Sequence, residues 1–330
     1  MNITSMCDEL PQFCTPFLLE TGTEMANTTR LAYAHEISWF IDYLIENTEY
    51  FCDKKKKEIT INDIKHVTAQ DISRYLTMYK DLGRAERTVA RKRAALSRFF
   101  TYLTDNRLIP FSPVAAAVHV KVHQSDEVIY LNMDEQIRFL DTVDGGDLLD
   151  QKKQKYHDKY RIRDIALITL LLDTGIRVSE LHGIDIGDFD FNECSVIVQR
   201  KGGNFQTVFF SDDTRDRLIE YLDERKAKNI DIIPTDAFFV TLKGERLSVR
   251  AIEVLVKKYA AAIPGKGRKI TPHKMRASFA MEFYTETKDI LALQRKLGHK
   301  NITATNIYAK ATDKKMKETR SILAEKRKKK

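Results

Sequence analysis

The segment DIALITLLLDTG, residues 164–175, constrains the fold more than any other stretch of the chain. A helix on the surface of a protein has one apolar stripe, whereas this segment is apolar on nearly every side. Such a helix is stable only where other elements enclose it, and Gly175 is the residue type that commonly ends a helix. We therefore expect a central buried helix in the second half of the chain.

The sequence after this segment changes from a helical period to an extended one. CSVIVQR and FQTVFF are rich in β-branched and aromatic residues, and the KGGN between them is typical of a turn, which predicts a β-hairpin over residues 194–210. Asn132 is the expected N-cap of an earlier helix. Helices are also expected at 214–228 and 249–256, with a short strand at 238–242 between them. The second half is therefore predicted to be mainly α with a small antiparallel β-sheet.

Three further helices are predicted nearer the N-terminus, where apolar residues recur every three or four positions. They cover residues 33–47, 68–82 and 87–103. The second opens with Thr68 and Asp71, which have the spacing of a capping box. Each of these helices has a one-sided apolar stripe, so each is expected to bury one face.

Pro110 and Pro113 end this helical region, and the stretch that follows them has no stable period. A chain of 330 residues is long enough for two domains that each bury a core. We predict an N-terminal helical domain over residues 1–117, a linker over residues 118–129, and a second domain over residues 130–330.

Composition excludes several classes of protein. No apolar run approaches the roughly 20 residues that cross a bilayer, and the N-terminus is acidic and polar where a secretion signal is basic and apolar. The four cysteines form no CxxC pair, so neither a structural metal nor a disulfide framework is expected. We expect a protein that stays inside the cell, and the formal net charge of +8 favours a polyanionic partner.

Arg87, Arg91 and Arg98 give the third N-terminal helix a basic face. At 100° per residue they project away from the apolar stripe, and they are spread over about 16 Å. A solvated surface is the simpler interpretation, because Lys and Arg are common on exposed helices. Since three aligned arginines also match a row of phosphates, we favour DNA contact.

Cationic, imidazole and phenol side chains stand at the ends of elements in the second domain, where they can converge. Single residues have ordinary explanations: Arg177 can pair with Glu180 one turn later, and Lys201 can be an exposed turn residue. His273 and Arg276 are three positions apart and share a helix face. The full set is Arg177, Lys201, His273, Arg276, His299 and Tyr308.

Together these groups meet the needs of phosphodiester chemistry without a metal. Arg177 and Arg276 can hold the charge that gathers on the phosphate oxygens with two-pronged hydrogen bonds. Tyr308 as nucleophile keeps the energy of the broken bond, although a phenol with a pKa of about 10 needs nearby cations or a base. Lys201 at the hairpin tip is the expected acid for the departing 5′-oxygen, and the two histidines can assist proton movement.

This set, with LGH nine residues before Tyr308, resembles the tyrosine recombinases, which include phage integrases, Xer-type resolvases and the integrases of conjugative transposons. The resemblance runs in the family's order from about residue 130 to residue 317. It implies a role for each residue: Arg177 and Arg276 as the arginine pair, Lys201 as the β-hairpin lysine and general acid, His273 as the histidine of HxxR, His299 as the second histidine, Tyr308 as the nucleophile, and Glu180 as a support behind the site.

The resemblance also implies a fold and an activity. The fold is an N-terminal helical core-binding domain, of the SAM-like kind, that closes with the catalytic domain as a C-shaped clamp around double-stranded DNA. The activity is site-specific recombination through a 3′-phosphotyrosyl intermediate and a Holliday junction, with neither metal nor other cofactor. The cell would be prokaryotic, and the enzyme would act in its cytoplasm on nucleoid DNA.

Two departures from the family pattern concern single positions. Ala277 follows the HxxR arginine where many members have histidine. The hairpin reads RKGGN where GKGxK is commoner, so the alignment of Lys201 depends on one register, with Lys266 or Lys269 as the alternative.

The C-terminal tail, MKETRSILAEKRKKK, places Met316 and Leu323 seven apart on a short amphipathic helix. A frayed, solvated terminus is the ordinary interpretation. In the family this region packs into a neighbouring subunit and couples four active sites in a ring, so we expect a tetramer on DNA with exchanged C-terminal helices.

Three other activities compete with recombination. A type IB topoisomerase shares the phosphotyrosine but rejoins the same strand, and a DNA-binding regulator would lack at least one catalytic position. A metal nuclease would need clustered Asp and Glu near the site, which the sequence does not show.

Overall fold

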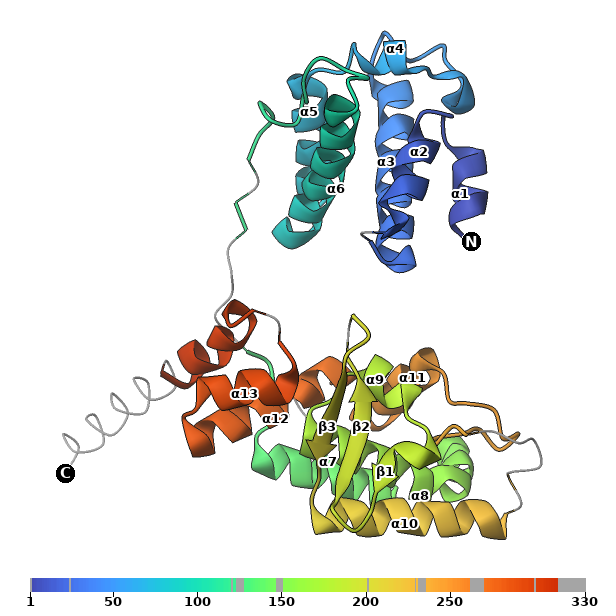
Figure 1. The fold of residues 1–330 in the computed structure, drawn as a ribbon, viewed down its shortest axis with the longest axis vertical. Helices are drawn as coiled ribbons and strands as arrows, with labels where there is room; N and C mark the ends of the chain where they lie inside the picture. The colour runs from blue at the N-terminus through green and yellow to red at the C-terminus, as the bar shows by residue number, and fades with distance from the viewer. Residues whose placement is uncertain are drawn as a thin grey trace, which may run out of the picture. The chain divides into compact units, whose positions relative to one another are not determined.

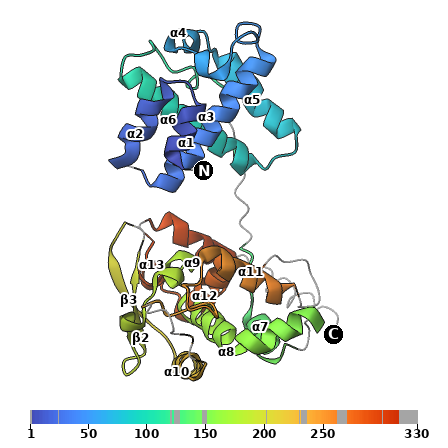
Figure 2. The ribbon, with the colours of Figure 1, turned by 90° about the vertical axis from the view of Figure 1, so that its right-hand side faces the viewer.

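The computed structural model describes residues 2–23, 25–119, 121–122, 128–146, 151–200, 202–228, 230, 236–261, 270–299 and 301–313. The chain forms two compact units, Met1–Gln124 and Ser125–Lys330 (Figures 1 and 2). Each unit is described here by itself.

The N-terminal unit is helical throughout its described elements. The three predicted helices are present, and Thr68 and Asp71 form both hydrogen bonds of the predicted capping box. The two short helices at the N-terminus were not expected, because seven residues each give too few turns for a periodic apolar stripe. The elements are α1 (Ile3–Glu9), α2 (Cys14–Glu20), η1 (Thr21–Thr23), α3 (Asn27–Asn47), η2 (Lys56–Glu58), α4 (Ile61–Ile64), α5 (Ala69–Asp81) and α6 (Glu86–Asp105).

Aromatic side chains join these helices into one core. Phe40 on α3 meets Tyr75 on α5 edge-on at 5.1 Å between ring centroids, and Phe100 on α6 at 6.2 Å. Phe17 on α2 meets Phe99 on α6 at 5.3 Å. The N-terminal helices are therefore part of the core that α3, α5 and α6 build (Figure 1).

The C-terminal unit is mainly helical and contains one small antiparallel sheet, as the sequence predicted. The capping box of Asn132 and Glu135 opens its first helix. The elements are α7 (Met133–Gly145), α8 (Gln151–Thr174), α9 (Val178–Gly183), η3 (Ile186–Asp188), β1 (Phe189–Asp190), β2 (Ser195–Gln199), β3 (Phe205–Phe209), α10 (Asp212–Ala227), α11 (Val249–Ala260), α12 (Pro272–Thr287) and α13 (Ile290–Leu297), followed by a helical segment over residues 303–313.

Helix α8 is the centre of this unit, which confirms the expectation from its all-round apolar sequence. α7, α10 and α12 pack against it, and in Figure 2 it lies between α10 and α12. Gly175 ends the helix at φ 61°, and a Cβ there would lie 2.4 Å from Cδ1 of Phe279. Both the left-handed backbone and the close approach of α12 therefore require glycine.

The sheet has the order β1-β2-β3, with antiparallel pairs throughout. The predicted hairpin is present: Val196 pairs with Val208 and Gln199 pairs with Phe205. The turn holds Gly202 at φ 102° and Gly203 at φ 86°, which glycine adopts at little cost. β1 was not predicted, because two residues carry no recognisable pattern.

The prediction of a strand at 238–242 was wrong. This segment makes only isolated bridges, one of them between Val240 and Arg246. Its backbone bonds go to different partners: Phe238 N–H donates to the Ile184 carbonyl, whereas Val240 N–H donates to the Tyr221 hydroxyl. A run of apolar residues thus fills the core without joining a ladder.

All four cysteines are free thiols. Among the described residues, no helix is both long and apolar enough to cross a membrane. The described side chains also contain no group of three His, Cys, Asp or Glu residues arranged to hold a metal ion.

Candidate active site

Arg177 and Glu180 form the first part of the candidate site, at the start of α9. The backbone N–H of Arg177 donates to Oε2 of Glu180 at 2.8 Å, and Nη1 of Arg177 donates to Oε1 at 2.6 Å. Glu180 is buried, whereas the Arg177 side chain keeps 33% of its surface exposed. The carboxylate therefore fixes a guanidinium that still faces solvent.

Arg276 enters from α12 and is 3% exposed. Its Nη1 donates to the carbonyl of Gly175 and its Nη2 to the carbonyl of Leu297, each at 2.5 Å. These two carbonyls lie two residues before Arg177 and two residues before His299. One side chain thus ties together the three segments that hold the predicted residues. Burial, with the nearby Arg177, lowers the pKa of Arg276 to about 10, which leaves it cationic at neutral pH.

His299 follows α13 directly after Gly298, which adopts φ 59° as the left-handed C-cap. Nδ1 of His299 lies 2.9 Å from the Thr305 hydroxyl, and its backbone carbonyl accepts from Gln294 Nε2 at 3.1 Å. Burial lowers the pKa of His299 to about 4, with Arg276, Arg177 and other nearby charges adding to the shift. The imidazole is therefore neutral at physiological pH.

His273 lies in the first turn of α12, where Thr271 caps the helix and Pro272 is its first residue. The ring faces solvent. Partial loss of hydration lowers the pKa of His273, and Arg276 is the charge that adds most to this effect. Both predicted histidines thus stand as neutral groups beside permanent cations.

Sequence reasoning missed Arg200, the last residue before the hairpin turn. It is 8% exposed, and its Nη1 donates to Oε2 of Glu180 at 2.5 Å. A signal was present, because Val196 and Val198 alternate with outward residues and this period places Arg200 on the inner face. Thr305, fully buried beside His299, was missed because no local pattern marks it.

Tyr308 is 3% exposed and lies in the helical segment 303–313. It packs in an apolar cluster with Ala277, Leu293 and Leu297. Burial raises the pKa of the phenol, and the nearby Arg276 opposes that shift. The phenol is therefore protonated and close to the arginine, but it is enclosed by apolar side chains.

Several predicted residues lie outside the described part of the chain. They are Lys201, the alternatives Lys266 and Lys269, and the tail residues Met316 and Leu323 with the final basic run.

The charges of the described site do not balance. Three guanidinium groups, those of Arg177, Arg200 and Arg276, act on one another, and one buried carboxylate, Glu180, serves them. The surplus is positive, and the Arg177 guanidinium brings it to the surface. Such a cluster can hold an anion with charge-assisted hydrogen bonds.

In the N-terminal unit, Arg87, Arg91 and Arg98 are all exposed on α6. Arg91 Nη2 lies 3.1 Å from Glu36, so Arg91 carries an internal ion pair. The exposure fits the predicted basic face.

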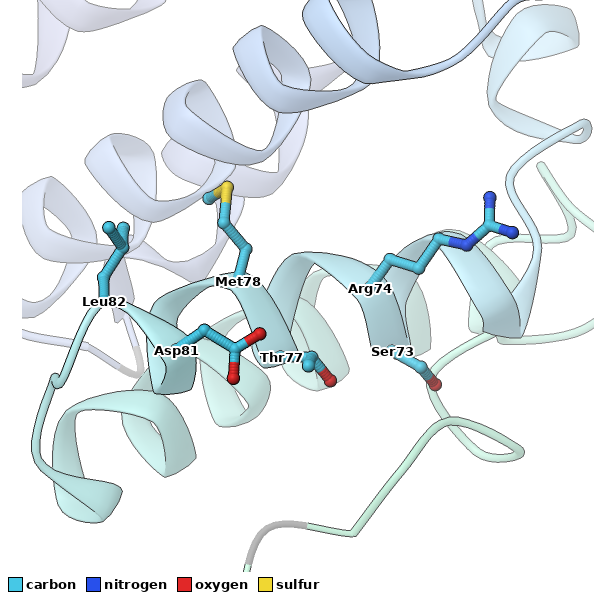
Figure 3. Close-up of a pocket in the computed structure, with 6 residues that line it drawn as sticks. All are labelled: Ser73, Arg74, Thr77, Met78, Asp81 and Leu82. Atoms are coloured by element: carbon cyan, nitrogen blue, oxygen red, sulfur yellow. The ribbon is translucent and has the colours of Figure 1, made fainter.

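An open pocket lies along α5 in the same unit (Figure 3). Ser73 at one end accepts a hydrogen bond from the backbone N–H of Val118 at 3.0 Å. None of the residues of the catalytic prediction lines this pocket. The lining residues are Ser73, Arg74, Thr77, Met78, Asp81 and Leu82.

Comparison with known proteins places the chain in a family. Residues 138–315 match the model of the phage integrase family, and residues 18–107 match that of the phage integrase N-terminal SAM-like domain. Tyrosine recombinase XerC of Thermodesulfovibrio yellowstonii is 32% identical over 233 residues, which cover 68% of this chain and 72% of the relative. XerC of Corynebacterium efficiens is 30% identical over 271 residues, which cover 82% of each.

Solved structures share the fold. XerH site-specific recombinase bound to a palindromic difH substrate has a TM-score of 0.69 at 20% identity, over 98% of this chain and 94% of that one. A lambda integrase dimer bound to a COC′ core site has a TM-score of 0.63 at 17% identity, over 93% and 77%. With more than half of the sequence matched by the catalytic family model, the chain belongs to the phage integrase family, the tyrosine recombinases, whose members are DNA strand-transferring enzymes.

Proposed function

We propose that the chain recombines specific sites in double-stranded DNA by cleaving a strand through a covalent bond to Tyr308 and joining it to a second site. The observation that carries the proposal is the surplus of positive charge where three guanidinium groups share Glu180. A phosphodiester under attack gathers negative charge on its oxygens. Fixed cations that are already in place stabilise that charge without reorganisation.

Arg177 and Arg276 are the proposed contacts to the phosphate oxygens. Arg177 is partly exposed and held by Glu180, and Arg276 is held by two carbonyls. Their partners fix both guanidinium groups before DNA arrives, which favours the transition state. His299 and His273 are neutral at physiological pH, so they would contribute hydrogen bonds or accept a proton and add no further charge.

In the covalent step the Tyr308 oxygen bonds to phosphorus and the bond from phosphorus to the 5′-oxygen breaks. The phenol proton passes to a neutral acceptor, for which His273 is the exposed candidate, and Lys201 gives a proton to the departing 5′-oxygen. The 5′-hydroxyl of a partner strand then reverses the step. Each exchange replaces one phosphoester with another, and two rounds pass through a Holliday junction.

The burial of Tyr308 sets a condition for this step. The Tyr308 side chain lies in one apolar cluster with Ala277, Leu293 and Leu297, and its raised pKa opposes ionisation. It must leave this cluster, or the cluster must open, before the oxygen can reach phosphorus. DNA binding is the proposed trigger, because the bound phosphate would draw on the same cations.

The proposed assembly is a tetramer that holds two DNA sites. Residues 1–117 would bind DNA through Arg87, Arg91 and Arg98, close with residues 130–330 as a clamp, and leave residues 118–129 as the linker. The tail would dock on the neighbouring subunit. Solved relatives bound to their DNA sites support the nucleic-acid part of this proposal, and bacterial relatives support a prokaryotic cytoplasm as its setting.

The test is Tyr308→Phe with nicked DNA duplexes that the chain selects from a random-sequence library. Unaltered protein should form a covalent adduct in EDTA, visible on a denaturing gel, and the variant should form none while it keeps its DNA affinity. An adduct that persists in the variant would reject Tyr308 as the nucleophile. Relaxation by a monomer of plasmids that lack a selected site would favour the topoisomerase alternative.

A further inference from the structure

We propose that Arg200 is a positioning residue that locks the hairpin, Glu180 and the end of α13 into one arrangement. Through Glu180 it sets the place of Arg177, and through α13 it sets the place of His299. The inference rests on the proposed function and adds a residue to it that the sequence motifs do not mark.

The contacts of Arg200 reach three different elements. Nε donates to Gln206 Oε1 on β3 at 2.9 Å, and Nη1 donates to Glu180 Oε2 on α9 at 2.5 Å. Nη2 donates to the carbonyl of Lys296 in the last turn of α13 at 2.8 Å. Every nitrogen of the guanidinium therefore has a partner within the protein, and the side chain is buried. We therefore assign Arg200 to holding the site together, and Arg177 and Arg276 remain the proposed contacts to the phosphate oxygens.

Gln206 completes the attachment to α13. Its Nε2 donates to the carbonyl of Arg295 at 3.0 Å, next to the carbonyl that Arg200 uses. The last carbonyls of a helix have no partner within the helix, and a cation near them also complements the helix dipole. Two hairpin side chains thus fix the helix end from which Gly298 and His299 continue.

Gly298 shows how closely the two parts fit. A Cβ at this position would lie 2.9 Å from Nε and 3.1 Å from Cδ of Arg200. The glycine is needed for its left-handed backbone and also for the space that Arg200 occupies. Gly298 and Arg200 are therefore matched in size, because a side chain at Gly298 would collide with Arg200.

Glu180 links this lock to the proposed phosphate site. Its Oε2 accepts from Arg200 and from the backbone N–H of Arg177, while Oε1 accepts from the Arg177 guanidinium. Without Arg200, the Glu180 carboxylate would lose its hydrogen bond to the hairpin and would turn toward Arg177 and Arg276. That movement would displace Arg177 and reduce the positive surplus.

The test compares Arg200→Gln and Arg200→Lys with Arg250→Gln, whose side chain is exposed on α11 and lies outside the lock. Cleavage is measured in a single turnover at saturating nicked DNA, alongside DNA affinity. Arg200→Gln should slow cleavage by about 10- to 100-fold, the scale of a misplaced catalytic group, with affinity within about threefold. Arg200→Lys should recover little, because an ammonium lacks the planar fork that reaches three acceptors. Arg250→Gln should keep the cleavage rate.

A second readout does not depend on cleavage. Arg200 is one of the charges that depress the pKa of His299, so histidine NMR of the full chain should show that pKa rising in Arg200→Gln. Circular dichroism checks that each variant is folded. If Arg200→Gln is unfolded, the same measurements on Arg200→Lys replace it. A double variant with Gly298→Ala should lose less cleavage than the two single losses combined, because both act on one contact.

An unchanged cleavage rate in Arg200→Gln would overturn the inference. So would a loss of DNA affinity equal to the loss of rate, since that would make Arg200 a DNA contact. If the unaltered chain formed no phosphotyrosine at all, the proposed function would fail. The His299 pKa in the two Arg200 variants would then still decide whether Arg200 is coupled to the end of α13.

Discussion

Each unit contains a buried carboxylate that holds two cations, and the two clusters differ in what surrounds them. In the N-terminal unit Glu36 lies 2.6 Å from Lys92 Nζ and 3.1 Å from Arg91 Nη2. Lys92 is 3% exposed, and its ammonium lies 4.0 Å from the ring centroid of Tyr79 and 4.4 Å from that of Trp39. In the C-terminal unit Glu180 holds Arg177 and Arg200 at similar distances, but Arg276 adds a third cation, which is bonded to carbonyls.

The difference shows how one arrangement serves two purposes. In the N-terminal unit the buried charges are matched, because the Glu36 carboxylate and the aromatic faces stabilise Lys92, while Arg91 reaches Glu36 with 64% of its side chain exposed. In this sense the cluster is complete, and it joins α3 to α6. The Glu180 cluster is incomplete, because two buried guanidinium groups, those of Arg200 and Arg276, accompany one buried carboxylate and Arg177 adds a third cation. A complete cluster contributes to the fold, whereas an incomplete one is ready for an anion.

The largest effect is expected from breaking the complete cluster. Glu36→Gln leaves Lys92 as a buried charge without its carboxylate and should destabilise the N-terminal unit by about 3–5 kcal/mol. Urea unfolding followed by Trp39, the only tryptophan of the chain, reports on this unit. The double change Glu36→Leu with Lys92→Met is the matched control and should recover most of the loss. An unchanged urea midpoint in Glu36→Gln would show that the Glu36–Lys92 ion pair does not stabilise the N-terminal unit.

The incomplete cluster should respond in catalysis. Arg276→Lys, and separately Arg177→Lys, should slow phosphotyrosine formation at saturating DNA by about 10²- to 10³-fold, because a lysine lacks the two-pronged geometry. The free energy of unfolding should change less than in Glu36→Gln. Arg250→Lys, on the exposed face of α11, is the control and should leave the rate unchanged. If Arg276→Lys and Arg177→Lys cleaved as fast as the control Arg250→Lys, Arg177 and Arg276 would have no part in the mechanism.

The basic face of α6 should supply affinity that depends on salt. Changing Arg87, Arg91 and Arg98 together to Ala should lower the slope of log affinity against log salt by about one unit for each arginine. Filter binding between 50 and 200 mM salt, roughly the range over which such slopes are read, measures it. Lys65→Ala on the same unit is the control, since Lys65 bonds to Asn62. If the salt slope stayed the same in the triple variant, the basic face of α6 would not contact DNA.

A smaller effect should come from His299. Its native pKa of about 4 lies below the ordinary value, so the unfolded chain takes up the proton first as pH falls. Its contribution to stability should be complete above about pH 6.5 and be lost as pH falls to about 4. The loss should be about 1–2 kcal/mol, because solvent screens a ring that is only half-buried. In His299→Gln, unfolding measured across this range should depend less on pH, and an unaltered slope would contradict the assignment.

Much of the fold could be predicted from local patterns. The capping box at Thr68 and the N-cap at Asn132 formed as predicted, and the two β-rich runs paired around the glycine turn. The segment at 238–242 shows the limit, since its apolar residues are buried without forming a strand. Its hydrogen-bond partners, Ile184 and Tyr221, are distant in sequence, so no local pattern could reveal them.

The sequence by itself determined which residue types are available for phosphodiester chemistry and where several helix caps and the hairpin turn lie. Those features follow from periods of two and 3.6 residues and from short-range capping, which a chain carries in its own order. Only the tertiary structure decided that Glu180 divides its oxygens between Arg177 and Arg200, and that Tyr308 is held in an apolar cluster. These outcomes depend on packing between elements that are far apart in the sequence, where the burial of each charge is set by its neighbours in space.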